Sequence, residues 1–128
     1  MPTFRREINS FFSGDVLDDE ETLLCYSRDA SLHTVRPTCV VYPKSVDDIT
    51  KLVRFVRNRK HDDPTISITA RSGGTDMSGG PLNESIILDV SKHLSGTAEI
   101  RGSDATVLPG TFYRDFEAET LKQSLLLP

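Results

Sequence analysis

Cysteine is scarce in this sequence, and its two cysteines lie far apart. Cys25 and Cys39 are too few and too widely spaced for a metal-binding knuckle or a CxxC redox pair. They could pair in an oxidising compartment, but free thiols in a reducing cytosol are the better expectation. The acidic run Asp18–Glu21 is better explained by a helix start than by a metal site. We therefore predict no metal centre.

Long apolar runs are also lacking. No stretch approaches the length of a membrane-spanning helix, so no transmembrane segment is predicted. The first residues, Met1–Phe12, have neither an uninterrupted apolar core nor a small-residue cleavage site, which argues against a signal peptide. The expected location is the cytoplasm, with any contact to the inner membrane made peripherally through partners.

Basic side chains are not in excess either. Fifteen Lys and Arg against nineteen Asp and Glu give a formal net charge of -4, which the phosphates of nucleic acid would repel. The basic run Arg54–Lys60 lies near the end of a predicted helix, where it forms a solvated face that complements the helix dipole. We therefore predict no nucleic-acid partner.

What is present is an ordinary globular composition. The 128 residues, 37% of them hydrophobic and 27% charged, fit one soluble domain with a modest core. The sequence closes on Leu125–Pro128, although chain termini are usually polar. This apolar end predicts an element that continues, hence a truncated domain with exposed apolar surface around Leu121–Leu127.

Residues 1–36 are predicted to form an N-terminal helical segment. Apolar residues at helical spacing predict one helix over Phe4–Phe12. A second short helix is expected over Asp19–Tyr26, with Leu23 and Leu24 turned inward.

The remainder, residues 37–128, is predicted to be α/β. A buried strand at Cys39–Tyr42 and a strand at Ile66–Thr69 flank a helix that begins at the capping box Ser45–Asp48 and ends near Arg59. This βαβ unit is expected to be parallel, with a right-handed crossover. The later elements are strands at Ile86–Val90, Thr97–Arg101 and Ala105–Leu108, and a helix capped by Thr111 whose inner face is Phe112, Phe116 and Leu121. The fold class is thus α/β (α+β): a small parallel βαβ subdomain with flanking helices, plus the first strands of a second sheet.

A glycine-rich loop, RSGGTDMSGG at Arg71–Gly80, follows the second strand of this unit. A diphosphate needs several backbone N–H groups aimed at one point, and glycine permits the positive φ values and the close approach that such a concavity demands. The loop contains no lysine, so backbone amides and the hydroxyls of Ser72, Thr75 and Ser78 would supply the donors. By spacing alone, a phosphate-binding loop and a ligand-free surface loop are equally compatible with this segment.

The pattern excludes two common phosphate-binding loops. There is no G-x-x-x-x-G-K-[ST], so the segment is not a P-loop. Pro81 and a strand follow it, instead of the helix that follows the G-x-G-x-x-G dinucleotide fingerprint.

Short motifs follow one another in order along the chain. They are Tyr26–Asp29, Val40–Pro43 (V-x-P), Ser45–Ile49 (S-x-x-D-[IV]), Arg71–Gly79 (R-[GS]-G-G-T-[DGS]-x-[ST]-G), Leu88–Ser91 (D-x-S/T) and Val107–Gly110 (V-x-P-G). In this order they resemble the FAD-binding domain shared by vanillyl-alcohol oxidase, p-cresol methylhydroxylase and the D-lactate and glycolate dehydrogenases. The resemblance implies that residues 37–128 are the N-terminal part of such a domain. The family's second FAD segment and its substrate domain are missing from this sequence.

The resemblance also implies which residues surround the cofactor. Those that would wrap the pyrophosphate are Ser72, Gly73, Gly74, Thr75 and Asp76. Those that would line the ribityl chain and ring are Met77, Ser78 and Gly79. Pro43 and the Pro109–Gly110 turn would pack beside the cofactor, and Arg71 would anchor the loop. Some relatives carry a histidine in this loop that bonds to the flavin ring; Thr75 and Asp76 stand there instead, so the implied FAD is non-covalent.

The implied activity is FAD-dependent oxidation of a small 2-hydroxy acid such as D-lactate or glycolate, with hydride passing to the flavin. No catalytic residue is expected within this sequence. Three alternatives stay open: an inactive fragment that lacks the C-terminal part of its chain, a free-standing flavin- or nucleotide-binding module that works with a partner subunit, and a ligand-free remnant. Surface positions are expected for His61 and His93, and a cofactor-side role is kept open for His33.

Overall fold

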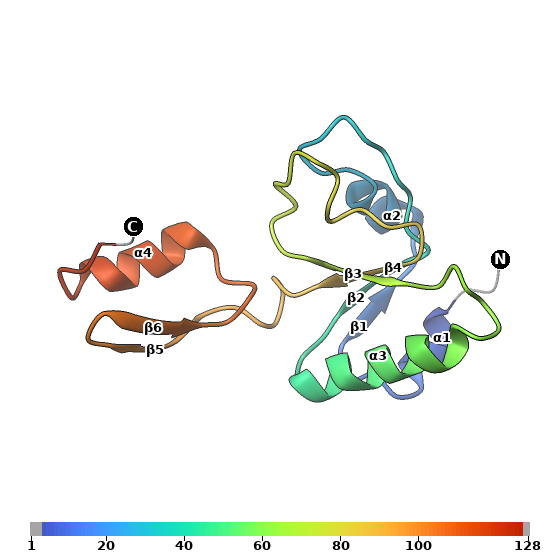
Figure 1. The fold of residues 1–128 in the computed structure, drawn as a ribbon, viewed down its shortest axis with the longest axis horizontal. Helices are drawn as coiled ribbons and strands as arrows, with labels where there is room; N and C mark the ends of the chain where they lie inside the picture. Colours follow the sequence, from blue (N-terminus) through green and yellow to red (C-terminus); the bar gives the residue numbers. More distant parts are fainter. Residues whose placement is uncertain (1–3, 127–128) are drawn as a thin grey trace.

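A four-stranded mixed sheet forms the centre of the computed structural model, which describes residues 4–126 apart from the side chain of Ala98. The strands are β1 (Asp15–Leu17), β2 (Cys39–Tyr42), β3 (Ile68–Arg71) and β4 (Ile86–Asp89). Their order across the sheet is β1-β2-β4-β3 (Figure 1). β2, β4 and β3 run parallel, and β1 pairs antiparallel with β2. The predicted α/β class is confirmed.

The two central strands are buried along their whole length. Every residue of β2 and of β4 is buried, as expected for parallel strands that are covered on both faces. Alternate side chains enter two different cores. On one face lie Cys39, Val41, Ile86 and Leu88, and on the other Val40, Tyr42 and Ile87.

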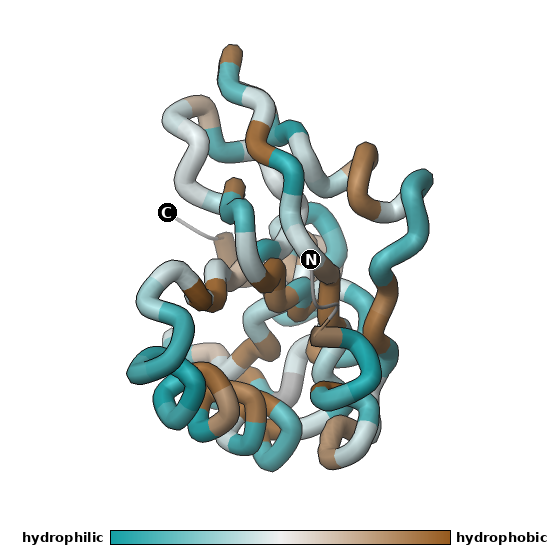
Figure 2. The backbone as a smooth tube through the Cα atoms, turned by 90° about the vertical axis from the view of Figure 1, so that its right-hand side faces the viewer, coloured by the Kyte–Doolittle hydropathy of each residue, from teal (hydrophilic) through white to brown (hydrophobic). Residues whose placement is uncertain are grey.

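Helices cover both faces of this sheet. On one side lie α1 (Arg5–Asn9) and α3 (Val46–Arg59), and on the other lies α2 (Glu20–Tyr26) (Figure 1). Polar and apolar residues alternate around the turns of α3, at the bottom of Figure 2, and its buried Leu52 and Val56 join the core. The Ser45 hydroxyl caps α3 by accepting from the Asp48 amide at 3.2 Å, so the predicted start of this helix is confirmed.

The predicted parallel relation of β2 and β3 is confirmed, but the two strands are not neighbours. β4 lies between them, with Ile86 in register with Cys39 on one side and with Ile68 on the other. Since β3 and β4 are parallel, the glycine-rich loop between them is a crossover that returns to the opposite edge of the sheet. This places its first residues at the carboxyl ends of the parallel strands.

Two details of the N-terminal segment differ from expectation. β1 was not expected, because its three residues are too few to show a period. The inward placement of Leu24 is wrong: its side chain is 60% exposed, and Leu23 alone represents α2 among the buried core residues.

A separate hairpin and a helix complete the chain. β5 (Thr97–Arg101) and β6 (Asp104–Val107) pair antiparallel, and α4 (Tyr113–Leu121) follows them. Thr111 does not cap α4: its hydroxyl lies 2.7 Å from the Leu108 carbonyl oxygen, and Phe112 occupies the N-cap position without a side-chain bond. The predicted inner face is also wrong for Phe112 and Leu121, which are about half exposed. α4 contacts strand β5 of this small hairpin, which leaves these two side chains about half uncovered.

The exposed apolar surface predicted around Leu121–Leu127 is present at Leu121 and Leu126, whereas Leu127 lies outside the described residues. Cys25 is exposed, Cys39 is buried, and both are free. Within residues 4–126, no helix has the length and apolar character needed to cross a bilayer.

Candidate functional site

The glycine-rich loop starts at the carboxyl edge of the sheet and lies against the connector that follows α2. The amide of Val90, just after β4, donates to the carbonyl oxygen of Arg71 at 3.0 Å. Further along the loop, the Ala30 amide donates to the Asp76 carbonyl oxygen at 3.2 Å. Figure 1 shows the loop and this connector side by side above the sheet. The loop is therefore held at one end by the sheet and in its middle by the connector.

Unused backbone donors distinguish the first half of this loop. The amides of Ser72 through Met77 donate to no acceptor among the described residues. A hollow of about 300 Å³ beside them is lined by Ala70, Arg71, Ser72, Gly73, Gly74, Thr75, Asp76, Gly80 and Pro81. Backbone amides normally find partners in a folded protein, and successive free ones form the concavities that bind anions. The arrangement can therefore receive a phosphate or diphosphate.

Two glycines of the loop are required by both conformation and space. Gly74 has φ +64°, and a Cβ added there would lie 2.4 Å from a guanidinium nitrogen of Arg71. Gly79 has φ +86°, and a Cβ there would lie 3.1 Å from the ring of His33. A side chain at either position would be strained and would meet a neighbour.

The guanidinium of Arg71 lies against Gly74 and is hydrogen-bonded to the connector. It donates to the carbonyl oxygens of Tyr26 at 3.2 Å and Arg28 at 2.8 Å, and it lies 4.9 Å from the centre of the Tyr26 ring. The charge of Arg71 is thus engaged within the protein. An anchoring role for Arg71 in the cofactor site stays a prediction.

The side chain of Asp76 is occupied by its own loop. Its Oδ1 accepts from the amide and hydroxyl of Ser78, both at 2.6 Å, and from the Gly80 amide at 3.4 Å. These bonds, that from the Ser78 hydroxyl foremost, hold the pKa of Asp76 below its usual value. A carboxylate would repel a phosphate, so any contribution of Asp76 to a diphosphate would come from its free amide. Ser78 likewise has its amide and hydroxyl engaged, and the Met77 side chain is exposed.

The remaining predicted site residues lie at the same edge of the sheet. Pro43 is buried directly after β2. The Gly110 amide donates to the Leu94 carbonyl oxygen at 2.8 Å, and a Cβ on Gly110 would lie 2.2 Å from the Val90 carbonyl oxygen. The Pro109–Gly110 turn is therefore packed against the end of β4, beside the start of the loop. Whether these residues touch a cofactor stays a prediction.

A partly buried hydrogen-bonded chain beneath the loop was not found by sequence reasoning. The Tyr26 hydroxyl donates to Asp89 Oδ2 at 2.6 Å and accepts from the Tyr42 hydroxyl at 3.1 Å, while the Ser91 amide and hydroxyl donate to Asp89 Oδ1. Burial, then the bond to Asp89, raises the pKa of Tyr26 strongly, so the phenol stays protonated. Tyr26 and Asp89 each fall within a recognised motif, but a motif does not show that they meet.

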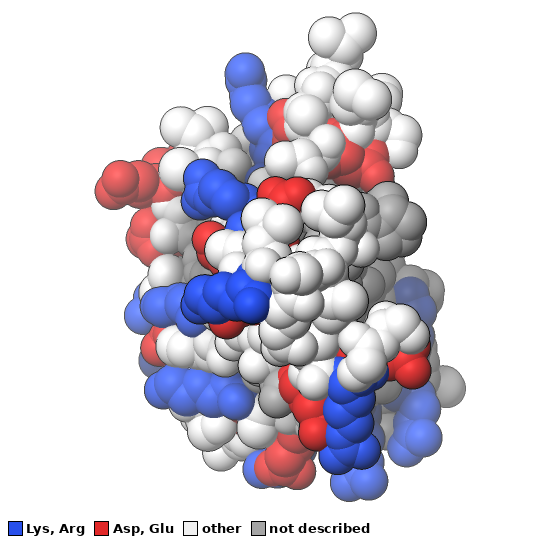
Figure 3. Space-filling model, turned by 90° about the vertical axis from the view of Figure 1, so that its left-hand side faces the viewer, with Lys and Arg blue, Asp and Glu red and all other residues white. Residues whose placement is uncertain are grey.

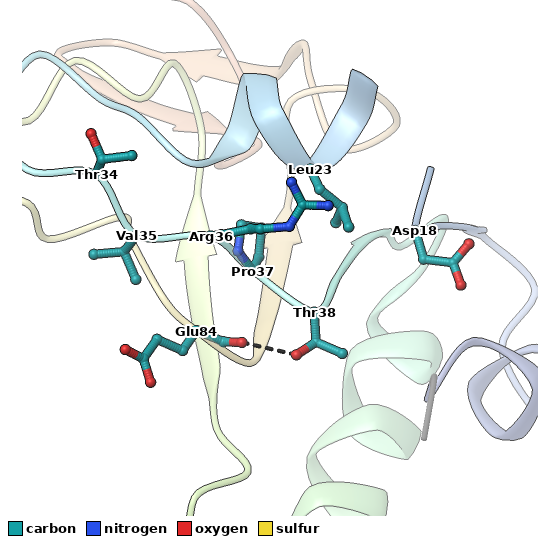
Figure 4. Close-up of a pocket in the computed structure, with 8 residues that line it drawn as sticks. All are labelled: Asp18, Leu23, Thr34, Val35, Arg36, Pro37, Thr38 and Glu84. Carbon is teal, nitrogen blue, oxygen red and sulfur yellow. Dashed lines mark hydrogen bonds between the residues drawn. The ribbon is translucent and has the colours of Figure 1, made fainter. Parts of the chain in front are cut away.

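Two other hollows are lined by different residues. One of about 520 Å³ is lined by Asp18, Leu23, Thr34, Val35, Arg36, Pro37, Thr38 and Glu84, at the amino ends of β2 and β4 (Figure 4). Its Arg36 is held by Glu20 in a bidentate pair, and its Thr38 hydroxyl donates to the Glu84 carbonyl oxygen. Another, of about 400 Å³, lies between Ser91 and the start of α4. The loop hollow is the smallest of the three, and its lining includes five successive unused amides, those of Ser72 through Asp76.

Outside the loop we considered the distribution of charge, the possible metal ligands and the remaining histidines. Basic and acidic side chains are interspersed on the face in Figure 3, without a continuous basic patch there. Among the described residues, no group of three His, Cys, Asp or Glu could hold a metal ion. His61 is exposed as expected, whereas His93 is partly buried and lies 2.8 Å from Asp15. The acidic run acts at a helix start as predicted, since Asp19 caps α2 by accepting from the Thr22 amide.

The fold and the loop together define an α/β domain with a run of unbonded backbone amides at the carboxyl edge of its sheet. Residues 37–128 match the family model described as FAD binding domain, and the chain belongs to this family. The predicted resemblance is thereby confirmed.

Relatives and solved structures agree with this assignment. D-2-hydroxyglutarate dehydrogenase of Escherichia coli (strain K12) is 31% identical over 96 residues, which are 75% of this chain and 9% of that protein. Two solved structures share the fold. For alkyldihydroxyacetonephosphate synthase the TM-score is 0.76 and the identity 19%, and the match covers 96% of this chain and 25% of that one. For p-cresol methylhydroxylase the TM-score is 0.74 and the identity 20%, and the match covers 94% of this chain and 24% of that one. The chain thus spans about a tenth of its sequence relative and a quarter of each structure.

Proposed function

We propose that this chain is the part of a flavin-dependent oxidoreductase that holds the diphosphate of FAD, non-covalently, in the loop Ser72–Gly79. The observation that carries the proposal is the run of unused amides from Ser72 through Met77 beside a hollow. Membership of the FAD binding domain family supports the choice of ligand among phosphate-bearing molecules. In the alternative of a ligand-free loop, these donors would bond to water, since residues 72–77 are exposed or half-buried.

We assign the parts of the cofactor to successive segments of the chain. The amides of Ser72, Gly73, Gly74, Thr75 and Asp76 would donate to the diphosphate. Met77 to Gly79 would lie nearer the ribityl chain and ring, and Pro43 with the Pro109–Gly110 turn would pack beside the cofactor at the carboxyl edge. When bound, FAD would supply the acceptor for a hydride from substrate. No residue of this chain is proposed to act on the substrate, because the chain spans only 9% of its relative.

The proposed substrate class is a small 2-hydroxy acid. D-lactate and glycolate are the predicted members, and relatives named D-2-hydroxyglutarate dehydrogenase add a dicarboxylate to the candidates. An enzyme that contains this domain should lose its flavin absorbance on mixing with one of these three acids in the absence of an electron acceptor. Absence of bleaching with all three would contradict the assignment of these acids as substrates. A cytoplasmic location stays a prediction.

FAD titration of the purified chain tests the cofactor part of the proposal. Riboflavin has the same ring and ribityl chain as FAD but lacks both the diphosphate and the adenosine, so adenosine serves as a second control ligand. FAD should bind at least about tenfold more tightly than riboflavin, since hydrogen bonds to a charged phosphate are lost with the latter. Binding would be followed by flavin fluorescence. Equal affinities, or no binding of either ligand, would contradict the proposal.

A further inference from the structure

An aromatic side chain from the C-terminal part of the chain touches the glycine-rich loop. Phe112 occupies the N-cap position of α4, and a Cβ added to Gly73 would lie 3.8 Å from its ring, an ordinary van der Waals distance. The start of α4 thus lies beside the start of the loop (Figure 1). The Phe112 side chain is nevertheless 53% exposed. About half of its surface is therefore open to a ligand that lies against the loop.

Phe112 also borders a second hollow, here called the Phe112 hollow. This hollow has a volume of about 400 Å³, within the range of small-molecule sites. Gly73 lines the loop hollow and Phe112 lines this one, so the two hollows adjoin where these residues meet. One extended ligand could therefore occupy both.

The lining of the Phe112 hollow suits a neutral group with hydroxyl and amino donors better than it suits a phosphate. Asp115 and Glu119 both line it, and their carboxylates would repel an anion. Lys122 donates to Oε1 of Glu119, while Oε2 accepts from no described residue. Carboxylates accept from the ribose hydroxyls of dinucleotides, and the hydroxyls of Ser95 and Thr97 in the same lining can donate or accept. These groups together fit a nucleoside.

The order of groups within FAD decides which half of the cofactor reaches this hollow. The diphosphate joins the ribityl chain and ring on one side to adenosine on the other. In the proposed function the diphosphate meets Ser72 through Asp76, and the ring lies beyond it, near Met77 to Gly79. Adenosine then leaves the loop at the opposite end, past Ser72 and Gly73, where Phe112 lies.

We propose that Phe112 stacks on the adenine of FAD and that the Phe112 hollow receives the adenosine, so that the chain selects FAD over flavins that lack adenosine. The inference rests on the proposed function and deepens it by assigning the nucleoside end of the cofactor. Asp115 and Glu119 would accept from the donors of the nucleoside. Every base has a π-face, and loss of one base–aromatic stack changes affinity by about tenfold.

Titration of the full chain with FAD, FMN and ADP tests this inference. FMN has the ring, the ribityl chain and one phosphate but no adenosine, whereas ADP has adenosine and diphosphate but no flavin. Phe112→Ala should bind FAD and ADP about tenfold more weakly than wild type, and FMN with unchanged affinity. Phe112→Tyr keeps the aromatic face and should bind FAD like wild type. Flavin fluorescence measures FAD and FMN, and competition against FAD measures ADP.

Tyr113→Ala is the matched control. Tyr113 is the next residue along α4, is 59% exposed and does not line the Phe112 hollow. This variant should bind all three ligands like wild type. Because Phe112 and Tyr113 are similarly exposed, the two alanine variants should have similar circular dichroism spectra and urea midpoints. A selective loss of FAD and ADP binding in Phe112→Ala would then come from the site and not from unfolding.

The contrary outcomes separate this inference from the proposed function. The role of Phe112 is overturned, while FAD binding by the loop stands, if Phe112→Ala binds FAD like wild type or weakens FMN as much as FAD. Equal losses in Phe112→Tyr or in Tyr113→Ala would overturn it too, as would equal affinities of the wild-type chain for FAD and FMN. If wild-type protein binds FAD no more tightly than riboflavin, the proposed function fails and this inference fails with it.

Discussion

At the scale of single residues, Gly74 combines a positive φ with contact against the guanidinium of Arg71. A side chain there would be strained by about 1–2 kcal/mol through conformation alone. It would also push the Arg71 guanidinium off the carbonyl oxygens of Tyr26 and Arg28, because the added Cβ would lie 2.4 Å from it. The loop would then lose the shape that exposes its amides.

Gly74→Ala should therefore weaken FAD binding by at least about tenfold. The matched control is Gly102→Ala in the β5–β6 turn, where φ is +57° and no atom lies within 4 Å of the added Cβ. Both variants should lose about 1–2 kcal/mol of unfolding free energy for the same conformational reason. Flavin fluorescence measures affinity, and urea unfolding measures stability. If both alanine variants bind FAD like wild type, the loop is not the site.

Residue types at the site could be predicted from the sequence, but side-chain directions could not. The glycines, hydroxyls and missing lysine of the loop indicate donors for an anion, and the structure leaves the amides of Ser72 through Met77 unused. That Asp76 folds back onto Ser78 depends on loop geometry, which no spacing rule encodes. The hydrogen-bonded series Asp89–Tyr26–Tyr42 was not predicted for a similar reason, since its members come from three elements far apart in sequence.

At the scale of elements, β1 is attached to the sheet by an ion-pair cluster as well as by its ladder. Asp15 Oδ2 lies 2.8 Å from His93 Nε2 and 2.9 Å from Lys92 Nζ, both in the turn after β4. The bond to His93 first, and then that to Lys92, lowers the pKa of Asp15 from 3.8 to about 2. Because the folded pKa is depressed, this stabilisation is present above pH ~4 and is lost as pH falls toward about 2.

Asp15→Asn should therefore reduce the loss of stability that wild-type protein shows between pH ~4 and pH ~2. The side chain is 36% exposed, so solvent screening limits the effect to about 1 kcal/mol. Asp47→Asn is the control, since it removes only the exposed pair with Lys51 on α3. Urea unfolding at stepped pH measures the difference. Parallel acid profiles for wild type and Asp15→Asn would show that the cluster does not attach β1.

Elements with a clear period were predictable, and short or isolated ones were not. α3 and β2 were predicted closely, because fourteen residues with a capped start and a fully apolar strand leave little ambiguity. β1 has three residues, and its pairing with β2 follows from the path of α1 and the turn around Gly14. The inner face assigned to α4 was wrong, since an apolar period predicts which residues share a face but not whether another layer covers it.

At the scale of the whole molecule, strand order decides where the site lies. Insertion of β4 between β2 and β3 brings the ends of three parallel strands to one edge, with the loop, Pro43 and the Pro109–Gly110 turn following them. Local patterns predicted each strand but not this order, because neighbours in a sheet are chosen by crossovers and packing. The ordered motifs did predict the family, which the match over residues 37–128 confirms.

The most direct test is backbone-amide NMR of the labelled chain during titration with FAD. The amides of Ser72 through Met77 should shift progressively and saturate with one common affinity, because they would gain the acceptors they lack within the protein. The amides of the β5–β6 turn at Gly102 and Ser103 serve as the internal control and should not move. If FAD leaves the loop amides in place while other parts of the chain respond, or if nothing shifts, the loop does not hold the diphosphate.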